Sequence, residues 1–216
     1  MKRPAADSSF GVTARKTCIS LLPLVESATN CYTEIHYANE EVIMRHFPVP
    51  DRVDMRYSDL TPALLQTLGI KLLLTDLDFT LAPKKISRPD GALKQWIEDL
   101  RQAGIAVMIV SNNRSGKRVE AFCADLGIPY QGHAGKPSPK GLLAAMERAG
   151  ATAGETAMLG DKLLTDVLAA RRAGVLALMV EPAGGAVTGF QKLLHALQAP
   201  GKAACRRKTE KNLDSP

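Results

Sequence analysis

The sequence predicts an α/β protein built on a doubly wound parallel sheet. Short apolar runs that suit strands alternate with amphipathic segments that suit helices, and the connections between them are short. The central run, Leu72 to Leu74, is three consecutive leucines, which is typical of a strand covered on both faces. The alternation of strand and helix segments along the chain favours parallel strands joined by crossover helices.

Each expected strand is a compact apolar run preceded or followed by a turn residue. The first is entered from Gly69, and the second follows Gly104, which suits the end of the preceding helix. The third is brief, and the last follows Gly174. The expected strands are 71–74, 105–110, 128–130, 157–159 and 175–180.

The expected helices show caps, breakers or an apolar stripe. Thr61 suits an N-cap and Pro62 the first helical position, while Leu93 and Trp96 belong to a stripe with spacings of three and four. Pro200 is expected to follow the end of the final helix. The expected helices are 39–44, 58–68, 90–104, 114–126, 139–149, 163–173 and 190–197.

Composition and charge suggest one domain with two extensions. Residues 1–44 show no sustained hydrophobic period, so we expect a loosely ordered N-terminal extension before a domain at 45–199. Residues 200–216 are expected to form a basic disordered tail. The formal charge of +6 comes from the two ends, because residues 1–16 and 201–216 each carry +3 and the remainder balances. Nucleic-acid binding is therefore only weakly supported.

The cysteine pattern and hydropathy indicate a cytoplasmic chain. The four cysteines lack metal-ligand spacing and suit a reducing compartment better than a disulfide framework. No stretch approaches the roughly 20 apolar residues of a transmembrane helix. We therefore expect no transmembrane segment, although the protein could act at the surface of a membrane.

Four polar clusters follow expected strands or open a crossover, which places them at one edge of the sheet. They are Asp76 with Asp78, Ser111 with Asn112, Lys136, and Asp161 with Asp166. Asp76 and Asp78 lie two positions apart, so their side chains point to the same side of an extended backbone. Alone, this pair is equally compatible with a simple turn. Together, the clusters predict a site for a hard divalent cation, Mg²⁺ above all.

The same clusters suit phosphoryl transfer. Asp76 can attack phosphorus and form an aspartyl phosphate, and Asp78 can protonate the leaving oxygen and later deprotonate water. Ser111 and the main-chain amide of Asn112 can bind phosphoryl oxygens, and Lys136 supplies a fixed positive charge. Thr80 is expected to contribute to substrate binding at the turn that follows Asp78. The expected metal ligands are Asp76, Asp78, Asp161 and Asp166.

These motifs resemble the haloacid dehalogenase superfamily of aspartate-nucleophile phosphatases. The match consists of the DxDxT at 76–80, Ser111, the Lys-Pro at 136–137 and the GDxxxxD at 160–166. The stretches TDLDFTL, VSNN, GKP and GDKLLTDV resemble the class IIIA branch called the YqeG family, which is similar to phosphatidylglycerophosphate phosphatases. Phe79 departs from the asparagine common in that family. The resemblance implies a Rossmann-like fold, Mg²⁺ and a phosphatidylglycerophosphate substrate.

The spacing of the motifs leaves no room for an inserted cap domain. Asp78 and Ser111 are 33 positions apart, and each later gap of 25 positions holds a single crossover. An open site suits a large substrate such as a lipid headgroup at an anionic membrane surface. As a group, basic residues in or near these loops could form a basic rim suited to a substrate with more than one phosphate, while any single one is more simply a solvated helix residue. These residues are Lys84, Lys85, Arg88, Arg114, Lys117, Arg118, Lys140 and Lys162.

Two alternatives remain from the sequence. The first keeps the chemistry but changes the substrate to a phosphosugar, nucleotide or phosphoprotein. The second is a non-catalytic scaffold that binds nucleic acid or ribosomes through its basic ends.

Overall fold

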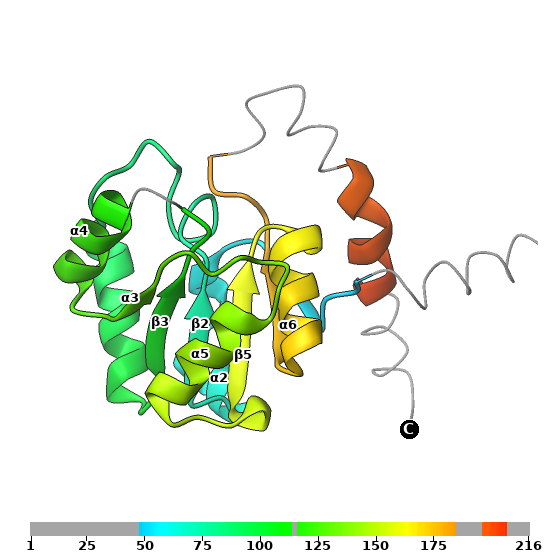
Figure 1. Cartoon of the computed structure of the whole chain (residues 1–216), viewed down its shortest axis with the longest axis horizontal. Coiled ribbons are helices and arrows are strands. Elements are labelled where there is room, and N and C mark those ends of the chain that lie inside the picture. Colours follow the sequence, from blue (N-terminus) through cyan, green and yellow to red (C-terminus); the bar gives the residue numbers. More distant parts are fainter. Residues whose placement is uncertain (1–47, 114–115, 185–195, 207–216) are drawn as a thin grey trace, which may run out of the picture. The chain divides into compact units, whose positions relative to one another are not determined.

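A six-stranded sheet lies at the centre of the structure, a computed structural model that describes residues 48–113, 116–184 and 196–206 (Figure 1). Every strand pair is parallel, and the strand order is β1-β6-β5-β2-β3-β4. The strands are β1 Arg52–Asp54, β2 Leu72–Thr75, β3 Ala106–Val110, β4 Tyr130–Gln131, β5 Thr156–Gly160 and β6 Leu176–Val180. The predicted α/β fold class is confirmed.

The helices begin and end where the sequence provides caps. The Thr61 hydroxyl accepts a hydrogen bond from Leu64 N (3.3 Å) ahead of Pro62, and Asp90 accepts one from Leu93 N (2.8 Å). The α-helices that surround the sheet are α2 Pro62–Thr67, α3 Gly91–Gln102, α4 Gly116–Leu126, α5 Lys140–Ala149 and α6 Leu168–Ala173. Shorter turns are η1 Tyr57–Asp59 and η2 Ala153–Glu155, and η3 Leu163–Val167 is a π-helix.

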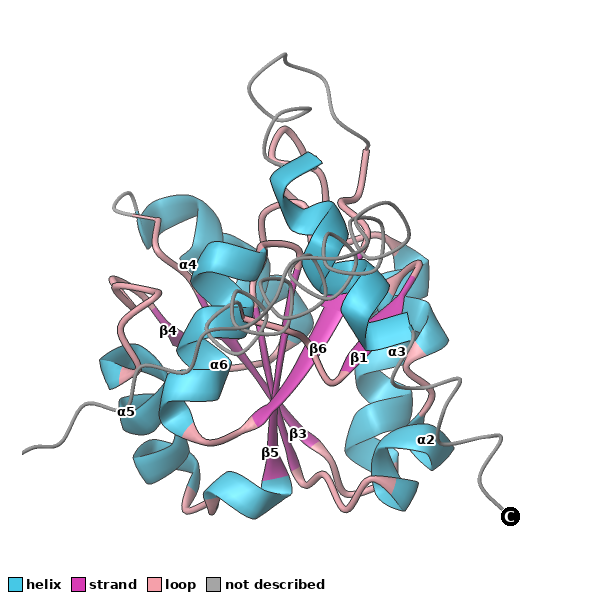
Figure 2. Cartoon of the chain, turned by 90° about the vertical axis from the view of Figure 1, so that its right-hand side faces the viewer, coloured by secondary structure: helices cyan, strands magenta, loops and turns pink. Residues whose placement is uncertain are grey.

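The leucines of β2 contribute to two separate cores, one on each face of the sheet. Leu73 packs with residues of α2, α3 and α4, whereas Leu72 and Leu74 pack with residues of α5, η3 and α6. Figure 2 shows α5 and α6 on one side of the strands and α2 and α3 on the other. Alternation along an extended strand produces this division, and it explains why the run is apolar throughout.

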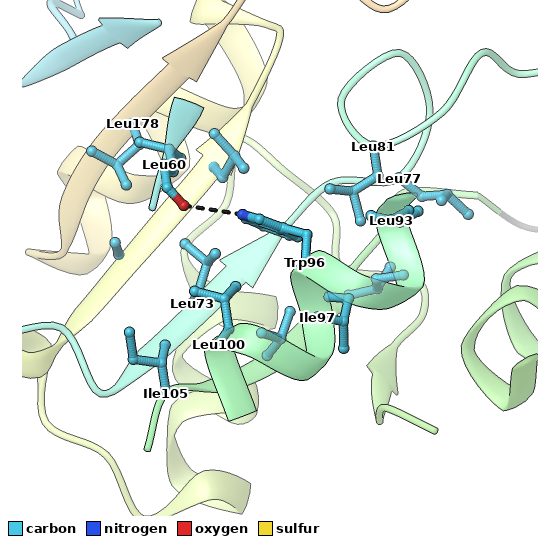
Figure 3. Packing of buried hydrophobic residues seen from close by; sticks show 14 of the residues in the cluster. Leu60, Leu73, Leu77, Leu81, Leu93, Trp96, Ile97, Leu100, Ile105 and Leu178 are labelled. Carbon is cyan, nitrogen blue, oxygen red and sulfur yellow. Dashed lines mark hydrogen bonds between the residues drawn. The ribbon is translucent and has the colours of Figure 1, made fainter. Parts of the chain in front are cut away.

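Trp96 anchors one of these cores. Its indole Nε1 donates to Leu60 O at 3.0 Å (Figure 3). Its ring lies edge-on to Tyr57 with the centroids 4.9 Å apart. The side chain therefore joins α3 to the segment that precedes α2. This position is consistent with the packing role expected from the apolar stripe of the helix.

The direction of strand addition reverses at β2. Along the chain, β3 and β4 extend the sheet on one side of β2, while β5, β6 and β1 lie on the other. Ligands of open α/β sheets bind outside the carboxyl ends of the strands at such a switch point. Asp76 directly follows β2, so the fold places this carboxylate at the expected position.

Three parts of the fold differ from the predictions. The edge strand β1 was missed, because its Arg-Val-Asp sequence is polar and its extended form comes from pairing with β6. The predicted helix at 163–173 begins with a π-turn. Residues 196–206 are helical, so Pro200 does not end the helix and the predicted tail boundary lies inside it (Figure 1). Burial of Gln198 and Cys205 against the domain outweighs the helix-breaking tendency of proline.

The expected helix at 39–44 lies outside the described residues, as does Arg114. Within the described part of the chain, no helix combines the length and apolar character needed to cross a membrane.

Candidate active site

A pocket of about 420 Å³ opens at the carboxyl end of β2. Its lining residues come from four separate loops and from η3. They are Asp76, Asp78, Phe79, Lys84, Ser111, Asn112, Asn113, Lys136, Lys162, Thr165 and Asp166. A larger cavity of about 770 Å³ includes Leu72 and Ala106, which begin their strands, and therefore lies at the opposite edge of the sheet. The smaller pocket contains the reactive groups, so the chemistry is assigned there.

The carboxylate of Asp76 is held by a buried lysine. Lys136 Nζ donates to Asp76 Oδ1 at 3.0 Å and lies 2.7 Å from Asp166 Oδ1, so one cation bridges two acids. Asp76 and Asp166 are themselves buried, and the main-chain N–H of Asp76 donates to Leu159 O in the neighbouring strand β5. Removing one partner of a buried ion pair costs about 3–5 kcal/mol, so this bridge fixes the geometry of the site.

Three carboxylates form a group that fits a metal ion. One oxygen from each of Asp76, Asp161 and Asp166 lies within 4.8 Å of the other two, and all three residues are buried. An all-oxygen, acidic set of ligands suits a hard divalent cation such as Mg²⁺. Buried acids at this separation also repel one another, which creates a demand for positive charge that Lys136 meets only in part.

Lys162 brings a second positive charge to the same oxygens. Its Nζ lies 2.6 Å from Asp161 Oδ1, 3.7 Å from Asp76 Oδ2 and 3.5 Å from the main-chain oxygen of Asp78. The side chain is only partly exposed, and its Nζ lies 5.7 Å from the centroid of the Phe79 ring. The ammonium group therefore contacts the oxygen atoms that a divalent cation at this site would use.

Burial and mutual repulsion alter the titration of these groups. Burial raises the pKa of Asp161 to about 6, and the charge of Lys162 opposes the rise. Burial also raises the pKa of Asp166, against the charge of Lys136. Burial alone would lower the pKa of Lys136, but the charges of Asp166 and Asp76 outweigh it, so its pKa lies above the ordinary value. Lys136 is therefore a permanent cation at neutral pH.

The carboxylate of Asp78 is not part of the group of three acids, although it was predicted to be a metal ligand. Its Oδ1 accepts a hydrogen bond from Arg118 Nη1, and both side chains are 19% exposed. The main-chain oxygen of Asp78 contacts Lys162, which pairs with the cluster. Arg118 was expected either in a basic rim or as a solvated helix residue, and the structure shows it paired with Asp78, which lines the pocket.

Thr80 is absent from the lining of the pocket, whereas Asn112 lines it and its side chain supports Lys136. Thr80 is 2% exposed and its hydroxyl donates to Asp161 Oδ1 at 3.2 Å, so it orients an acid instead of facing substrate. The Asn112 side chain accepts from Lys136 N and donates to Lys136 O, each at 2.8 Å. It thereby fixes the backbone that presents the lysine. Ser111 is buried at the pocket, where its hydroxyl accepts from Asn113 N at 3.1 Å.

Phe79 has an unusual backbone conformation with a φ of 69°. Its N–H donates to Ala82 O and its carbonyl accepts from Ala183 N, so hydrogen bonds on both sides hold the turn. Asparagine tolerates this left-handed region better than a bulky residue does. The left-handed backbone therefore explains why related proteins commonly have asparagine at this position. With phenylalanine, the backbone at this position is strained.

Comparison with known proteins agrees with this geometry. A family model described as haloacid dehalogenase-like hydrolase matches residues 21–174. The chain is 33% identical over 167 residues to "Probable phosphatase YqeG" of Bacillus subtilis (strain 168), covering 74% of this chain and 96% of that protein. It is 29% identical over 154 residues to "Phosphatidylglycerophosphate phosphatase 1, chloroplastic" of Chlamydomonas reinhardtii, covering 67% of this chain and 55% of that protein.

Among solved structures, the chain is similar to the cobalt-bound deoxy-D-mannose-octulosonate 8-phosphate phosphatase of Haemophilus influenzae. The TM-score is 0.47 at 21% identity, covering 63% of this chain and 91% of that one. The family match spans most of the domain and includes all four sequence motifs. An enzymatic family contradicts the alternative of a non-catalytic scaffold. The chain belongs to the haloacid dehalogenase-like hydrolase family and is a phosphatase.

Proposed function

We propose that this protein is a Mg²⁺-dependent phosphomonoesterase that forms an aspartyl phosphate on Asp76. The observation that carries the proposal is the buried group of three acids around Asp76, bridged by Lys136 at the switch point of the sheet. When bound there, Mg²⁺ would supply positive charge to the phosphoryl oxygens. Asp76, Asp161 and Asp166, with the main-chain oxygen of Asp78, would hold it.

The reaction follows from the positions of two acids. An Asp76 carboxylate oxygen attacks phosphorus, the bond from phosphorus to the ester oxygen breaks, and that oxygen takes its proton from the Asp78 carboxyl group. Asp78 then removes a proton from water as the water oxygen attacks phosphorus. The bond to Asp76 breaks, inorganic phosphate leaves, and both aspartates return to their starting forms.

Other pocket residues would stabilise the transferring phosphoryl group. The Lys136 ammonium group is fixed beside Asp76, and the Ser111 hydroxyl lies at the pocket wall where it can donate to a phosphoryl oxygen. Asn112 acts through Lys136, because its side chain holds the lysine backbone. Thr80 acts through Asp161 in the same indirect way.

We further propose phosphatidylglycerophosphate as the substrate, bound at an anionic membrane surface by a cytoplasmic enzyme. The name of the relative from Chlamydomonas reinhardtii supports the choice, and so do the short loops around the pocket, since the described residues include no domain inserted between them. Lys84 is exposed and lines the pocket, where it can meet the second phosphate of this lipid. Soluble phosphate esters are the competing substrates.

Hydrolysis assays test both parts of the proposal. Phosphatidylglycerophosphate in mixed micelles should be the best substrate in a panel that includes phosphosugars and nucleotides, with activity lost in EDTA and restored by Mg²⁺. Asp76→Asn should abolish turnover and the acid-stable labelling of the protein by phosphate. Full activity in EDTA, or in Asp76→Asn, would refute the mechanism; a preference for a soluble ester would refute only the substrate.

A further inference from the structure

Arg118 of α4 joins the carboxylate of Asp78 to a loop in the pocket wall. Its Nη1 donates to Asp78 Oδ1, while Nε and Nη2 donate to Ile86 O at 3.0 and 2.7 Å. Nη2 also donates to Pro83 O at 3.4 Å. Lys84, which lines the pocket, lies between the two carbonyls that Arg118 holds. One guanidinium therefore fixes an acid and a loop at the same time.

We propose that Arg118 is a positioning residue for the proton transfers of Asp78. The inference rests on the proposed function, which makes Asp78 the acid and base of the reaction. Its basis is the separation of the two neighbouring aspartates: the Asp76 carboxylate belongs to the metal-binding group, and the Asp78 carboxylate does not. Arg118 holds Asp78 Oδ1 away from that group and leaves Oδ2 to carry the transferred proton.

Arginine suits this task better than lysine would. Its planar fork of N–H groups reaches the carboxylate and two carbonyl oxygens in fixed directions, whereas an ammonium group has no such rigid geometry. Arg118 and Asp78 are both mostly buried, so the pair is screened less than a surface ion pair. The contact is therefore suited to setting the direction in which Asp78 delivers a proton.

The role predicts a dependence on the leaving group. An alkyl phosphate releases a poor leaving group, so its first step needs the proton from Asp78. A p-nitrophenyl phosphate releases a stable phenolate, so its first step proceeds without that proton, and only hydrolysis of phospho-Asp76 needs the base. General acid–base catalysis contributes about 10²–10⁴-fold, which bounds the expected loss.

The experiment compares Arg118→Ala with Asp78→Asn and wild type, each loaded with Mg²⁺. Arg118→Ala should lower kcat for glycerol phosphate about 100-fold or more, with little change in KM. With p-nitrophenyl phosphate, it should give a burst of nitrophenolate and accumulate phospho-Asp76. Added guanidinium ion should partly restore turnover in Arg118→Ala, and Arg118→Lys should restore less than the wild-type residue.

Arg171→Ala is a matched control. Arg171 also bridges a carboxylate and a carbonyl, because it donates to Asp51 Oδ1 at 2.7 Å and to Val49 O at 2.9 and 2.6 Å. It lies on α6, outside the pocket lining. Its loss should affect thermal stability without changing the ratio of the two substrate rates, the burst or the response to guanidinium.

The outcomes separate this inference from the proposed function. If Asp78→Asn shows no leaving-group dependence, the acid–base role of Asp78 fails. If Asp78→Asn shows it but Arg118→Ala slows the first step of both substrates equally and gives no burst, Arg118 only stabilises the loop and the inference is overturned. Unchanged kinetics in Arg118→Ala would overturn it as well. A burst with guanidinium rescue in Arg118→Ala supports it.

Discussion

Gly160 is the position at which one methyl group should disrupt the acid group. It ends β5 immediately before Asp161, and a Cβ placed there would lie 2.3 Å from Asp166 Cβ and 2.4 Å from Asp166 Cγ. These separations are far below van der Waals contact. Because Asp166 belongs to the π-helix η3 and its Oδ2 accepts from Lys162 N at 3.1 Å, the whole turn would have to move.

The size of the effect follows from overpacking and from the loss of a buried ion pair. Overpacking a tight core position costs about 1–3 kcal/mol. Moving Asp166 also weakens its 2.7 Å contact with Lys136, and breaking a buried pair costs about 3–5 kcal/mol in the limit. We therefore expect Gly160→Ala to lower the free energy of unfolding by about 3 kcal/mol, which corresponds to a fall in Tm of roughly 6–12 °C.

The assay combines thermal unfolding with calorimetric titration of Mg²⁺. Gly160→Ala should lower Tm and weaken Mg²⁺ binding about tenfold or more, because Asp166 supplies one of the three acids. Gly141→Ala is the control for a clash outside the acids, since its Cβ would lie 2.5 Å from Ala134 O. It should lower Tm with little effect on the affinity for Mg²⁺.

Gly154→Ala controls for substitution itself, because nothing lies within 4 Å of its added Cβ. It should leave both measurements unchanged. The reasoning would be refuted if Gly160→Ala bound Mg²⁺ with the affinity of the wild type, or if Gly141→Ala weakened binding as much as Gly160→Ala did. The first result would mean that Asp166 does not supply a metal ligand, and the second that the loss of Mg²⁺ binding is not specific to the acids.

Three other substitutions test separate parts of the structure. Phe79→Asn should raise the free energy of unfolding by about 1 kcal/mol in urea titrations, because asparagine relieves the strain of a φ of 69°; destabilisation would refute this. Trp96→Phe should lower the free energy of unfolding in urea titrations by about 1 kcal/mol or more, because the hydrogen bond to Leu60 O is lost. An unchanged urea midpoint would contradict the anchoring role of Trp96. Lys162→Met should strengthen calorimetric Mg²⁺ binding about tenfold by removing a positive charge 2.6 Å from Asp161, and weaker binding would show that Lys162 supports the ion.

Much of the fold could be predicted because its signals are local. The three leucines of β2 indicated a strand covered on both faces, and the structure places them in two cores. Thr61 caps the helix that it was expected to cap, and the helix expected to begin at 90 is capped by Asp90. The strand β1 gave no such signal, since three residues paired with β6 owe their conformation to the sheet and not to their own sequence.

The sequence predicted which residues form the candidate site better than it predicted which atoms those residues contact. Motif spacing brought Asp76, Lys136, Asp161 and Asp166 together, because parallel strands align their carboxyl ends. Spacing does not say which way a side chain turns within a loop. Thr80 therefore appeared to be a substrate ligand, although its hydroxyl bonds to Asp161.

Arg118 shows most clearly why the remaining contacts escaped prediction. It lies 40 positions after Asp78 on a helix whose neighbouring basic residue, Lys117, is exposed, so its sequence context matches that of a surface cation. What distinguishes it is a cluster of acceptors from distant segments, one carboxylate and two loop carbonyls. Main-chain carbonyls have no side-chain identity, so no motif can encode them. A residue that positions an acid through such atoms becomes visible only when the loop and the helix are placed together in three dimensions.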